Sequence, residues 1–314
     1  GGADFDSAPF GAFTASVTIL QGNTEYTTVF LSAPQETFVP PPENPCVEIP
    51  SNVCVEEGLY IFDPIDLPIV NESYFITYQR CCRNNSITNL INPGGSGATY
   101  FMELTPEAQE LCNNSPTFND FPPIVICAGE EFNFDHSATD IDGDQLVYEF
   151  CSPFLGGGPN TGGGSQGANG VAPNPDLPQP YNFVNFVPVV YDPLNPLGNE
   201  SDIEIDVVNG LITGTPNLQG QFVVGVCVYE YRNGVLLSTI RRDFQFNVSF
   251  CEPNVVADLS EDEIINDQFY IESCGENTIN FINQSYQQSF IDVYRWEFEV
   301  GVEIVTLSDW SPSY

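Results

Sequence analysis

The sequence contains no lysine, and its six basic residues are all arginines. Against them stand 43 aspartates and glutamates, which gives a formal net charge of -37. Binding to DNA or RNA depends on Lys and Arg side chains that neutralise phosphates, so this composition excludes nucleic acid as a natural partner. It also disfavours docking on an anionic membrane surface. Without lysine the chain cannot form Lys–Asn isopeptide crosslinks, and any mechanical strength must come from other bonds.

Histidine is nearly absent as well, because His136 is the single one in the chain. A zinc site of the usual His/Cys type, or a hydrolytic triad with a histidine base, would have to use it. Neither a GxSxG nor an HExxH motif is present. We therefore predict that this chain has no catalytic residues and is not an enzyme. We expect His136 to lie in a loop or at the edge of a sheet.

Long apolar runs are missing too. The longest, around residues 222–228, has the length of a strand and falls far short of the ~20 residues that a membrane helix needs. The chain also lacks a basic segment followed by an apolar one, which is the pattern of a secretion leader. We therefore expect no direct membrane insertion. We interpret the chain as a piece of a longer protein, whose secretion and anchoring signals lie elsewhere.

Cysteine, by contrast, is abundant, with ten in an acidic chain that is rich in glycine and proline. This combination predicts a secreted protein that folds in an oxidising compartment and forms disulfides. The sequence alone does not fix the pairing. We predict Cys46 with Cys54, which closes a short loop, and Cys151 with Cys227, which ties strands of two sheets together. Each bridge is expected to contribute ~2–4 kcal/mol of stability by restricting the unfolded chain.

Two of the cysteines, Cys81 and Cys82, are adjacent. Neighbouring side chains on a strand point to opposite faces, so we expect two separate disulfides, one on each side. A ring closed between the two neighbours is the alternative, and it is strained. A redox-active pair is disfavoured, because such pairs usually have a CxxC spacing at the start of a helix.

Short runs rich in Val, Ile, Phe, Tyr and Thr, separated by Pro, Gly and Asn, make up most of the chain. They predict an all-β fold of tandem Ig-like or cadherin-like β-sandwiches followed by an incomplete sandwich. One short helix is expected at 104–114, where a proline stands at an early-turn position. Strands are expected, among other places, at 13–20, 24–31, 74–82, 279–285 and 294–301.

Three domains are predicted. Residues 1–117 form an N-terminal β-rich domain that contains the adjacent cysteines. Residues 118–251 form an Ig-like or cadherin-like sandwich, interrupted at 155–180 by a Gly- and Pro-rich insertion that is either mobile or held by a partner. Residues 252–314 form the first half of a third sandwich. Half a sandwich leaves an open edge and an unburied core face, so the natural protein continues or this piece pairs with another chain.

Three aspartates stand at every second position in DIDGDQ, residues 140–145. Asp140, Asp142 and Asp144 can turn their carboxylates toward one hard cation such as Ca2+, which binds about six to eight oxygens. An EF-hand needs Gly and Glu at positions where this chain has Gln145 and Cys151, so the EF-hand interpretation fails. An ordinary acidic turn is the alternative. Three carboxylates this close, however, repel one another strongly without a cation.

A half-buried strand is expected directly after these aspartates, because Leu146, Tyr148 and Phe150 fall on one face. We therefore place the metal in the loop that leads into this strand, where it would rigidify the sandwich. Catalysis by the carboxylates is disfavoured. An acid and base pair needs two environments that separate the pKa values, and this loop supplies only one.

Three motifs carry a resemblance to known families. The pattern AxDxDGDxLxY (138–148), followed by GLITGTPxxxGxFxVxVxVxE (210–230), resembles cadherin-like and Ig-like modules of bacterial surface proteins. INFINQS, YRWEFEVG and SDWSPSY resemble the first half of a PKD domain, whose usual G-x-Y-x-V strand is missing here. YFITYQRCCRN, with SPTF and IC downstream, is similar to large PKD-containing, gliding-motility-associated surface proteins of Bacteroidota. Together these matches cover most of residues 46–314.

The resemblance implies a type IX secretion cargo that is displayed on the bacterial cell surface and used for adhesion. It implies Asp140, Asp142 and Asp144 as calcium ligands and transfers no catalytic residues. We therefore expect a segment of a large extracellular adhesin or cell-surface filament, rigidified by Ca2+ and disulfides. Its expected partners are other copies in a homo-oligomer or filament, and a target cell surface or glycan.

The alternative function is a carbohydrate-binding accessory module of a secreted polysaccharide-processing protein. Exposed aromatic side chains arranged as a platform for sugars would favour it. The two tryptophans, Trp296 and Trp310, both fall inside the PKD-like pattern, where at least Trp296 is expected in the core.

Overall fold

The computed structural model describes residues 15–32, 34–39, 56–157, 175–251, 260, 263–265, 268–270, 278–284, 294–300 and 303–308. The protein is nearly all β, with 43% of residues in strands and 4% in helix, and its sheets are mostly antiparallel. The predicted all-β sandwich fold is therefore confirmed. No helix in the described residues is long and apolar enough to span a membrane.

The chain divides into two compact units, Gly1–Glu43 with Ile49–Phe250 and Asn44–Glu48 with Cys251–Tyr314. The longer segment of the second unit begins at Cys251. The division expected near residue 117 falls inside the first unit, because β6 (Ala98–Leu104) pairs with β15 (Val235–Ser249) in one sheet. Strands on either side of residue 117 thus share a single set of backbone hydrogen bonds.

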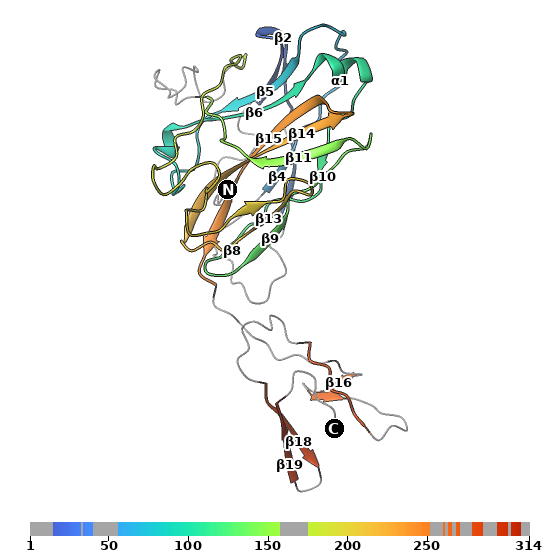
Figure 1. Ribbon diagram of the computed structural model, residues 1–314, viewed down its shortest axis with the longest axis vertical. Coiled ribbons are helices and arrows are strands. Elements are labelled where there is room, and N and C mark those ends of the chain that lie inside the picture. Colours follow the sequence, from blue (N-terminus) through green and yellow to red (C-terminus); the bar gives the residue numbers. More distant parts are fainter. Residues whose placement is uncertain are drawn as a thin grey trace. The chain divides into compact units, whose positions relative to one another are not determined.

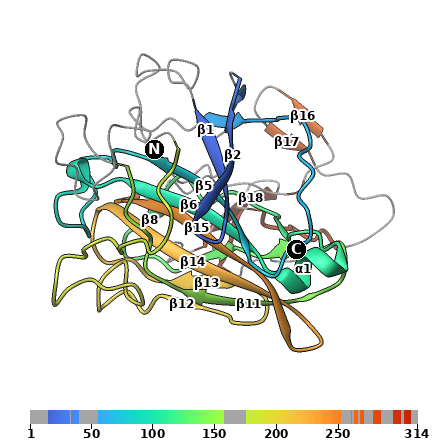
Figure 2. The same cartoon turned by 90° about the horizontal axis from the view of Figure 1, so that it is seen from above.

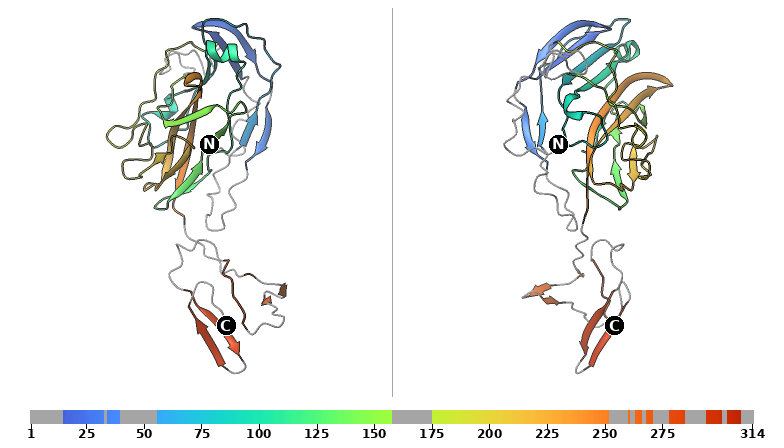
Figure 3. Two further views of the ribbon diagram at one scale, coloured as in Figure 1. Left: turned by 45° about the vertical axis from the view of Figure 1, so that its right-hand side comes forward. Right: turned by 90° about the vertical axis from the view of Figure 1, so that its left-hand side faces the viewer.

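One eight-stranded sheet organises the first unit (Figure 1). Seven strands follow the order β11-β14-β15-β6-β5-β1-β2, and β8 pairs with β15 beside this path. The further bounds are β1 (Ser16–Gln21), β2 (Thr24–Phe30), β5 (Tyr74–Arg80), β8 (Ile126–Cys127), β11 (Gln145–Phe150) and β14 (Gly220–Arg232). Figures 2 and 3 show β1 and β2, in blue, on the far side of β5 and β6 from β14 and β15, in orange. Strands were correctly predicted within 13–20, 24–31 and 74–82.

Smaller elements complete the first unit. Its small sheets are β3 (Gln35–Phe38) with β4 (Glu56–Leu59), β7 (Thr117–Phe118) with β10 (Ala138–Thr139), and β12 (Glu204–Ile205) with β13 (Leu211–Gly214) and β9 (Phe132–Asp135). A 3-10 helix, η2, spans Pro93–Gly95. The predicted helix is found as α1 (Pro106–Leu111), where the Thr105 hydroxyl caps the first turn by accepting from the Ala108 amide.

A long hairpin forms the middle of the first unit. β14 and β15 pair from Gly220–Val248 to Arg232–Val235, and the two residues between them, Asn233 and Gly234, both have positive φ, at 54° and 81°. An Asn-Gly loop of this kind matches the twist of its flanking strands. The apolar run at 222–228 is buried almost throughout. It lies under side chains on both faces of the sheet, which is why it does not alternate.

Two clusters of buried side chains cover these faces. On one face, Val224 and Val226 of β14 pack with Phe134 of β9 and Ile212 of β13, so the small sheet closes the sandwich. On the other face, Val223 packs with a second cluster contributed by connecting segments. The members of that cluster are Ile87, Leu90, Leu155 and Val184.

The disulfides differ from prediction in two respects. Cys151 does bond to Cys227, with the Cα atoms 5.8 Å apart. Since Glu149 pairs with Cys227 across β11 and β14, this bridge joins neighbouring strands of one sheet, and the predicted link between two sheets is wrong. The prediction of two separate bridges at Cys81 and Cys82 is also wrong, because these residues bond to each other just after the end of β5, where strand alternation no longer applies.

Three further cysteines lie in the described residues. Cys127 and Cys251 are also disulfide-bonded, and Cys112 is a free thiol on the surface. The predicted pair of Cys46 and Cys54 lies outside the described residues.

The second unit contains two hairpins in its described residues. They are β16 (Glu263–Ile265) with β17 (Gln268–Tyr270), and β18 (Trp296–Val300) with β19 (Glu303–Leu307). β18 lies within the strand predicted at 294–301, and the Trp296 ring lies 5.7 Å from that of Phe281 between centroids. The described residues of 279–285 form only single bridges. Two asparagines there, which are poor strand formers, weaken the pattern.

Candidate metal site

The predicted aspartate loop connects β10 to β11. Its turn is closed by hydrogen bonds back to Asp140, whose carbonyl oxygen accepts from the Gly143 amide at 3.4 Å and whose Oδ1 accepts from the Asp144 amide at 2.8 Å. Gly143 has a φ of +79° in open surroundings, so the backbone conformation, and not crowding, calls for glycine. The loop is thus fixed by its own sequence before any ion binds.

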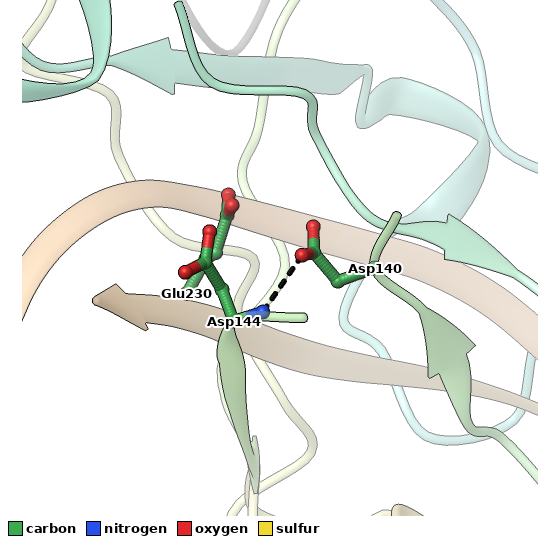
Figure 4. Close-up of side chains that lie close together, drawn as sticks. All are labelled: Asp140, Asp144 and Glu230. Carbon is green, nitrogen blue, oxygen red and sulfur yellow. Dashed lines mark hydrogen bonds between the residues drawn. The ribbon is translucent and has the colours of Figure 1, made fainter. Parts of the chain in front are cut away.

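Strand pairing then adds a carboxylate that lies far away in the sequence. Leu146 of β11 pairs with Glu230 of β14, so the start of β11 meets the end of β14. Carboxylate oxygens of Asp140, Asp144 and Glu230 all lie within 4.8 Å of one another. Figure 4 shows these three side chains gathered at one place. Two of the three predicted ligands are therefore brought together, and Glu230 joins them.

Asp142, the third predicted ligand, is occupied with other contacts. Its Oδ2 accepts from the Asn114 backbone amide at 2.9 Å, and the Asn114 side chain donates to both carboxylate oxygens at 3.2 Å. Arg232 lies 3.2 Å from the same Oδ2. The Asn114 amide hydrogen bond is the main cause that lowers the pKa of Asp142. Asp142 thus fastens the aspartate loop to the segment that follows α1.

Arg232 supplies a positive charge at the edge of the cluster. Its Nε and Nη2 donate to the two oxygens of Asp144, both at 2.7 Å, and Nη2 also donates to Asn113 at 2.8 Å. This bidentate pair lowers the pKa of Asp144 and raises that of Arg232. Part of the carboxylate repulsion expected from the sequence is therefore offset by the chain itself.

Glu230 is fully buried beneath the loop. Its Oε1 accepts from Asn113 Nδ2 at 2.5 Å, and its Oε2 accepts from the Ser238 hydroxyl. Burial is the main cause that raises the pKa of Glu230, and a hydrogen bond with Asp144 raises it further. Both oxygens point at donors, but each keeps a second lone pair that a metal can use.

Asp140 provides the observation that best fits a cation. Its Oδ2 is buried and makes no hydrogen bond within the described part of the chain. An unpaired buried carboxylate oxygen is costly, and a hard divalent cation between Asp140, Asp144 and Glu230 would remove that cost. The residues present therefore fit a hard cation such as Ca2+, for which Asp140 Oδ2 is the oxygen that has no other partner.

The chain matches no family model, no curated protein and no solved structure. Its function must therefore be inferred from the geometry of this site and from the sequence patterns.

Three contributors to the site were missed by the sequence analysis. Glu230 ends a long apolar strand, and only the antiparallel pairing of that strand with residues 145–150 places it beside the aspartates. Arg232 follows two residues later on the same strand, and Asn113 lies just past α1. The one available signal was the sequence E-Y-R before the Asn-Gly turn, where charged residues interrupt an apolar run.

His136, the only histidine in the chain, is a buried residue of the aromatic core. It lies between β9 and β10, in a connection as expected, but its ring is fully buried. Four aromatic rings surround it at centroid distances of 5.0–6.3 Å, from Phe118, Phe134, Tyr148 and Phe244. Neither ring nitrogen has a hydrogen-bond partner in the described residues. Burial, and then the charge of Arg242, lower the pKa of His136 to about 3.

His136→Phe is expected to make the protein more resistant to acid. The folded pKa of about 3 lies below the ordinary value of 6.5, so stability is full above 6.5 and is lost as the pH falls. The loss amounts to about 1.4 kcal/mol per pH unit, or roughly 2 kcal/mol at pH 5. Denaturant unfolding at neutral pH and at pH 5 measures it, and the variant should lack this component. An equal pH dependence in both proteins would show that His136 is hydrated.

Proposed function

We propose that this chain is a segment of a large extracellular adhesin or cell-surface filament of a bacterium, stiffened by Ca2+ and by disulfides. Several properties of the chain support this proposal. A net charge of -37 attracts cations and keeps separate copies apart until charge is screened. Disulfides suit an oxidising exterior. The sequence resemblance to gliding-motility surface proteins adds the secretion route and the adhesive role.

The observation that most strongly supports this proposal is the unpaired Asp140 Oδ2, which lies in a cluster that joins three segments. Asp140 and Asp144 belong to the loop before β11, and Glu230 belongs to β14. The segment after α1 enters through Asn113, which donates to Glu230. A calcium ion at this place would crosslink the loop to the sheet and would resist the separation of β11 from β14. A segment that transmits force between a cell and a surface needs such links.

Calcium is expected to raise the melting temperature of the wild-type protein relative to chelator. At about 100 times the dissociation constant the stabilisation is about 2.7 kcal/mol, or roughly 5–10 °C for a unit of this size. Asp140→Asn should abolish this increment, since it keeps the oxygen that accepts from Asp144 but removes the charge. Calorimetry with calcium, magnesium and chelator measures the difference.

Two control variants sharpen this experiment. Asp142→Asn removes the charge beside Arg232 and one of the two oxygens that accept from Asn114, so it should lower the melting temperature alike with and without calcium. Glu204→Gln changes an exposed carboxylate on β12 and should behave like the wild type. A calcium increment that survives in Asp140→Asn but disappears in Asp142→Asn would contradict a site built from Asp140, Asp144 and Glu230.

The adhesive or filamentous role is tested on the same samples. Negative-stain imaging and mass measurement, first with calcium and then with chelator, should show rings, fibres or defined oligomers that depend on calcium. Asp140→Asn should then fail to assemble. A uniform monomer under both conditions would overturn the filament, whatever the calorimetry shows, and would leave a tethered binding module.

A further inference from the structure

A short segment lies across the first strands of the large sheet. We call this segment, residues 175–182, the strap. The Leu177 amide donates to Gln79 Oε1 at 2.9 Å, and Gln79 Nε2 donates back to the Leu177 carbonyl at 3.4 Å. The Asp176 amide donates to Thr18 Oγ1 at 2.9 Å. The strap is therefore held to β1 and β5 by polar contacts.

These contacts are buried to an unusual degree for polar groups. Thr18, Thr77, Gln79 and Asp176 are exposed by 0%, 1%, 2% and 2%, so all four are shielded from water while the strap is docked. A carboxyl group in such a place is stable only if its charge is compensated or if it carries a proton.

No positive charge compensates Asp176 in the described residues. The side chains that face it are Thr18 on β1 and Thr77 on β5, with the Gln79 backbone amide, and none of these groups titrates. The one titratable group coupled to it is the phenol of Tyr181, in the strap itself. Burial, and then the charge of Asp176, raise the pKa of that phenol, so it stays neutral.

Hydrogen-bond counting supplies the second argument. The Thr77 hydroxyl has one proton but two acceptors, the Thr18 carbonyl oxygen and Asp176 Oδ2, each at 3.2 Å. Asp176 Oδ1 is already used, since it accepts from the Gln79 amide at 3.3 Å. A proton on Oδ2 satisfies Asp176, Thr77 and Thr18, because Asp176 then donates to Thr77 and Thr77 donates to Thr18, whereas the buried Tyr181 hydroxyl has no partner in the described residues. An ionised Asp176 leaves one acceptor unpaired.

We propose that Asp176 is a proton-controlled latch, which holds the strap on β1 and β5 when protonated and releases it when ionised. Burial raises the pKa of Asp176 to about 7 from 3.8, so the change falls near neutral pH. Since docking raises the pKa, its benefit is complete below 3.8 and is lost as the pH rises through about 7.

Release would change the surface of the first unit. The strap contributes Leu177, Pro178 and Tyr181 to the lining of a pocket of about 50 Å3, which Gln79 and Leu155 also line. Lifting the strap opens this pocket and bares Gln79, Thr77 and Thr18. A neutral or alkaline medium would therefore present a polar patch on the sheet that an acidic medium keeps covered.

Hydrogen exchange of the strap amides tests the latch on the whole chain. After correction for the intrinsic pH dependence of exchange, protection at 176 and 177 is expected to fall at least tenfold between about pH 5.5 and about pH 8.5. Asp176→Asn mimics the protonated acid, because its amide donates to Thr77 and its oxygen accepts from Gln79. It should keep full protection at both pH values. Glu131→Gln, which alters an exposed carboxylate elsewhere, should follow the wild type.

Each outcome of this experiment either supports the latch or contradicts it. Constant protection in the wild type, or an equal fall in wild type and Asp176→Asn, would overturn the latch. If Asp176→Asn fails to fold, the carbon chemical shift of the Asp176 carboxyl in the wild type decides. A midpoint near 7 supports the proposal, and a midpoint near the ordinary 3.8 contradicts it.

Discussion

Asp243→Ala is expected to lower the free energy of unfolding by about 3–5 kcal/mol. Asp243 lies on β15 and forms a bidentate ion pair with Arg83, with Nη1–Oδ1 and Nη2–Oδ2 distances of 3.0 and 2.5 Å. The two side chains are exposed by only 7% and 4%. Removing the carboxylate leaves a buried guanidinium without its counterion, and this is the main source of the loss.

The place of this ion pair in the sheet adds to the effect. β6 pairs with β15 only through the short stretch from Leu104 to Met102. Beyond it, Arg83 links β15 to the residue just before β6, because its Nε donates to the Gly97 carbonyl at 3.1 Å while its Nη groups reach Asp243. A further donation to the Phe154 carbonyl at 3.1 Å uses the remaining face of the guanidinium. Loss of the pair should therefore loosen the β5–β6 half of the sheet from the β14–β15 half.

A double-mutant cycle isolates the pair. Arg83→Leu with Asp243→Leu should recover part of the stability that either single change removes, because no unpaired charge stays buried. Glu149→Ala serves as the matched control, since Glu149 is exposed and accepts a hydrogen bond from Tyr229; we expect a change within about 0.5 kcal/mol. Urea unfolding measures all these proteins. A loss below about 1 kcal/mol in Asp243→Ala would mean that water reaches Arg83.

Local patterns predicted local structure well. The alternation of Leu146, Tyr148 and Phe150 placed β11 correctly, because one buried face is enough to impose a period of two. The proline at an early-turn position of α1 was equally informative, since the start of a helix is decided within a few residues. In both cases the signal and the structure that it specifies lie within one turn or strand.

Long-range pairing explains what the sequence patterns did not reveal. Glu230 reaches the aspartates only because β11 pairs with β14. Cys151, just after β11, and its partner Cys227 on β14 are 76 residues apart in the sequence. Likewise, nothing near residue 117 shows that strands on its two sides share a sheet. Asp142 was indistinguishable from its neighbours by spacing, and its departure from the cluster depends on Asn114, which α1 positions. Such contacts are set by tertiary packing, which periodicity does not encode.

Asp176 and His136, two buried titratable groups, change the stability of the first unit in opposite directions as the pH changes. Asp176 favours the docked strap in acid, whereas neutral His136 favours the folded core at higher pH. Together they narrow the pH range in which the core is stable and the strap is also docked. In the extracellular location that we propose, the protein would meet changes of pH and cation content directly. The proposed calcium site and the proposed Asp176 latch would then make the surface of this unit respond to the medium.

Replacing Cys151 and Cys227 together by alanine is expected to cost about 4 kcal/mol. The bridge closes a loop with a sequence separation of 76, which includes the Gly- and Pro-rich insertion. The loop-closure model assigns this cost to the unfolded chain, which becomes less restricted when the crosslink is lost. Because β11 and β14 are already hydrogen-bonded neighbours, the native fold should persist with its contacts intact.

Because the loss of stability arises in the unfolded state, a second measurement can test this prediction. A chain without the crosslink expands further on unfolding, so the dependence of the unfolding free energy on guanidinium should steepen as the midpoint falls. Cys112→Ala, which removes the exposed free thiol, should change neither quantity. A lower midpoint with an unchanged slope would place the loss in the native state, at the site vacated by the fully buried Cys227. An unchanged midpoint would mean that the sheet alone holds these strands, and calcium would then be the stronger of the two links proposed for this unit.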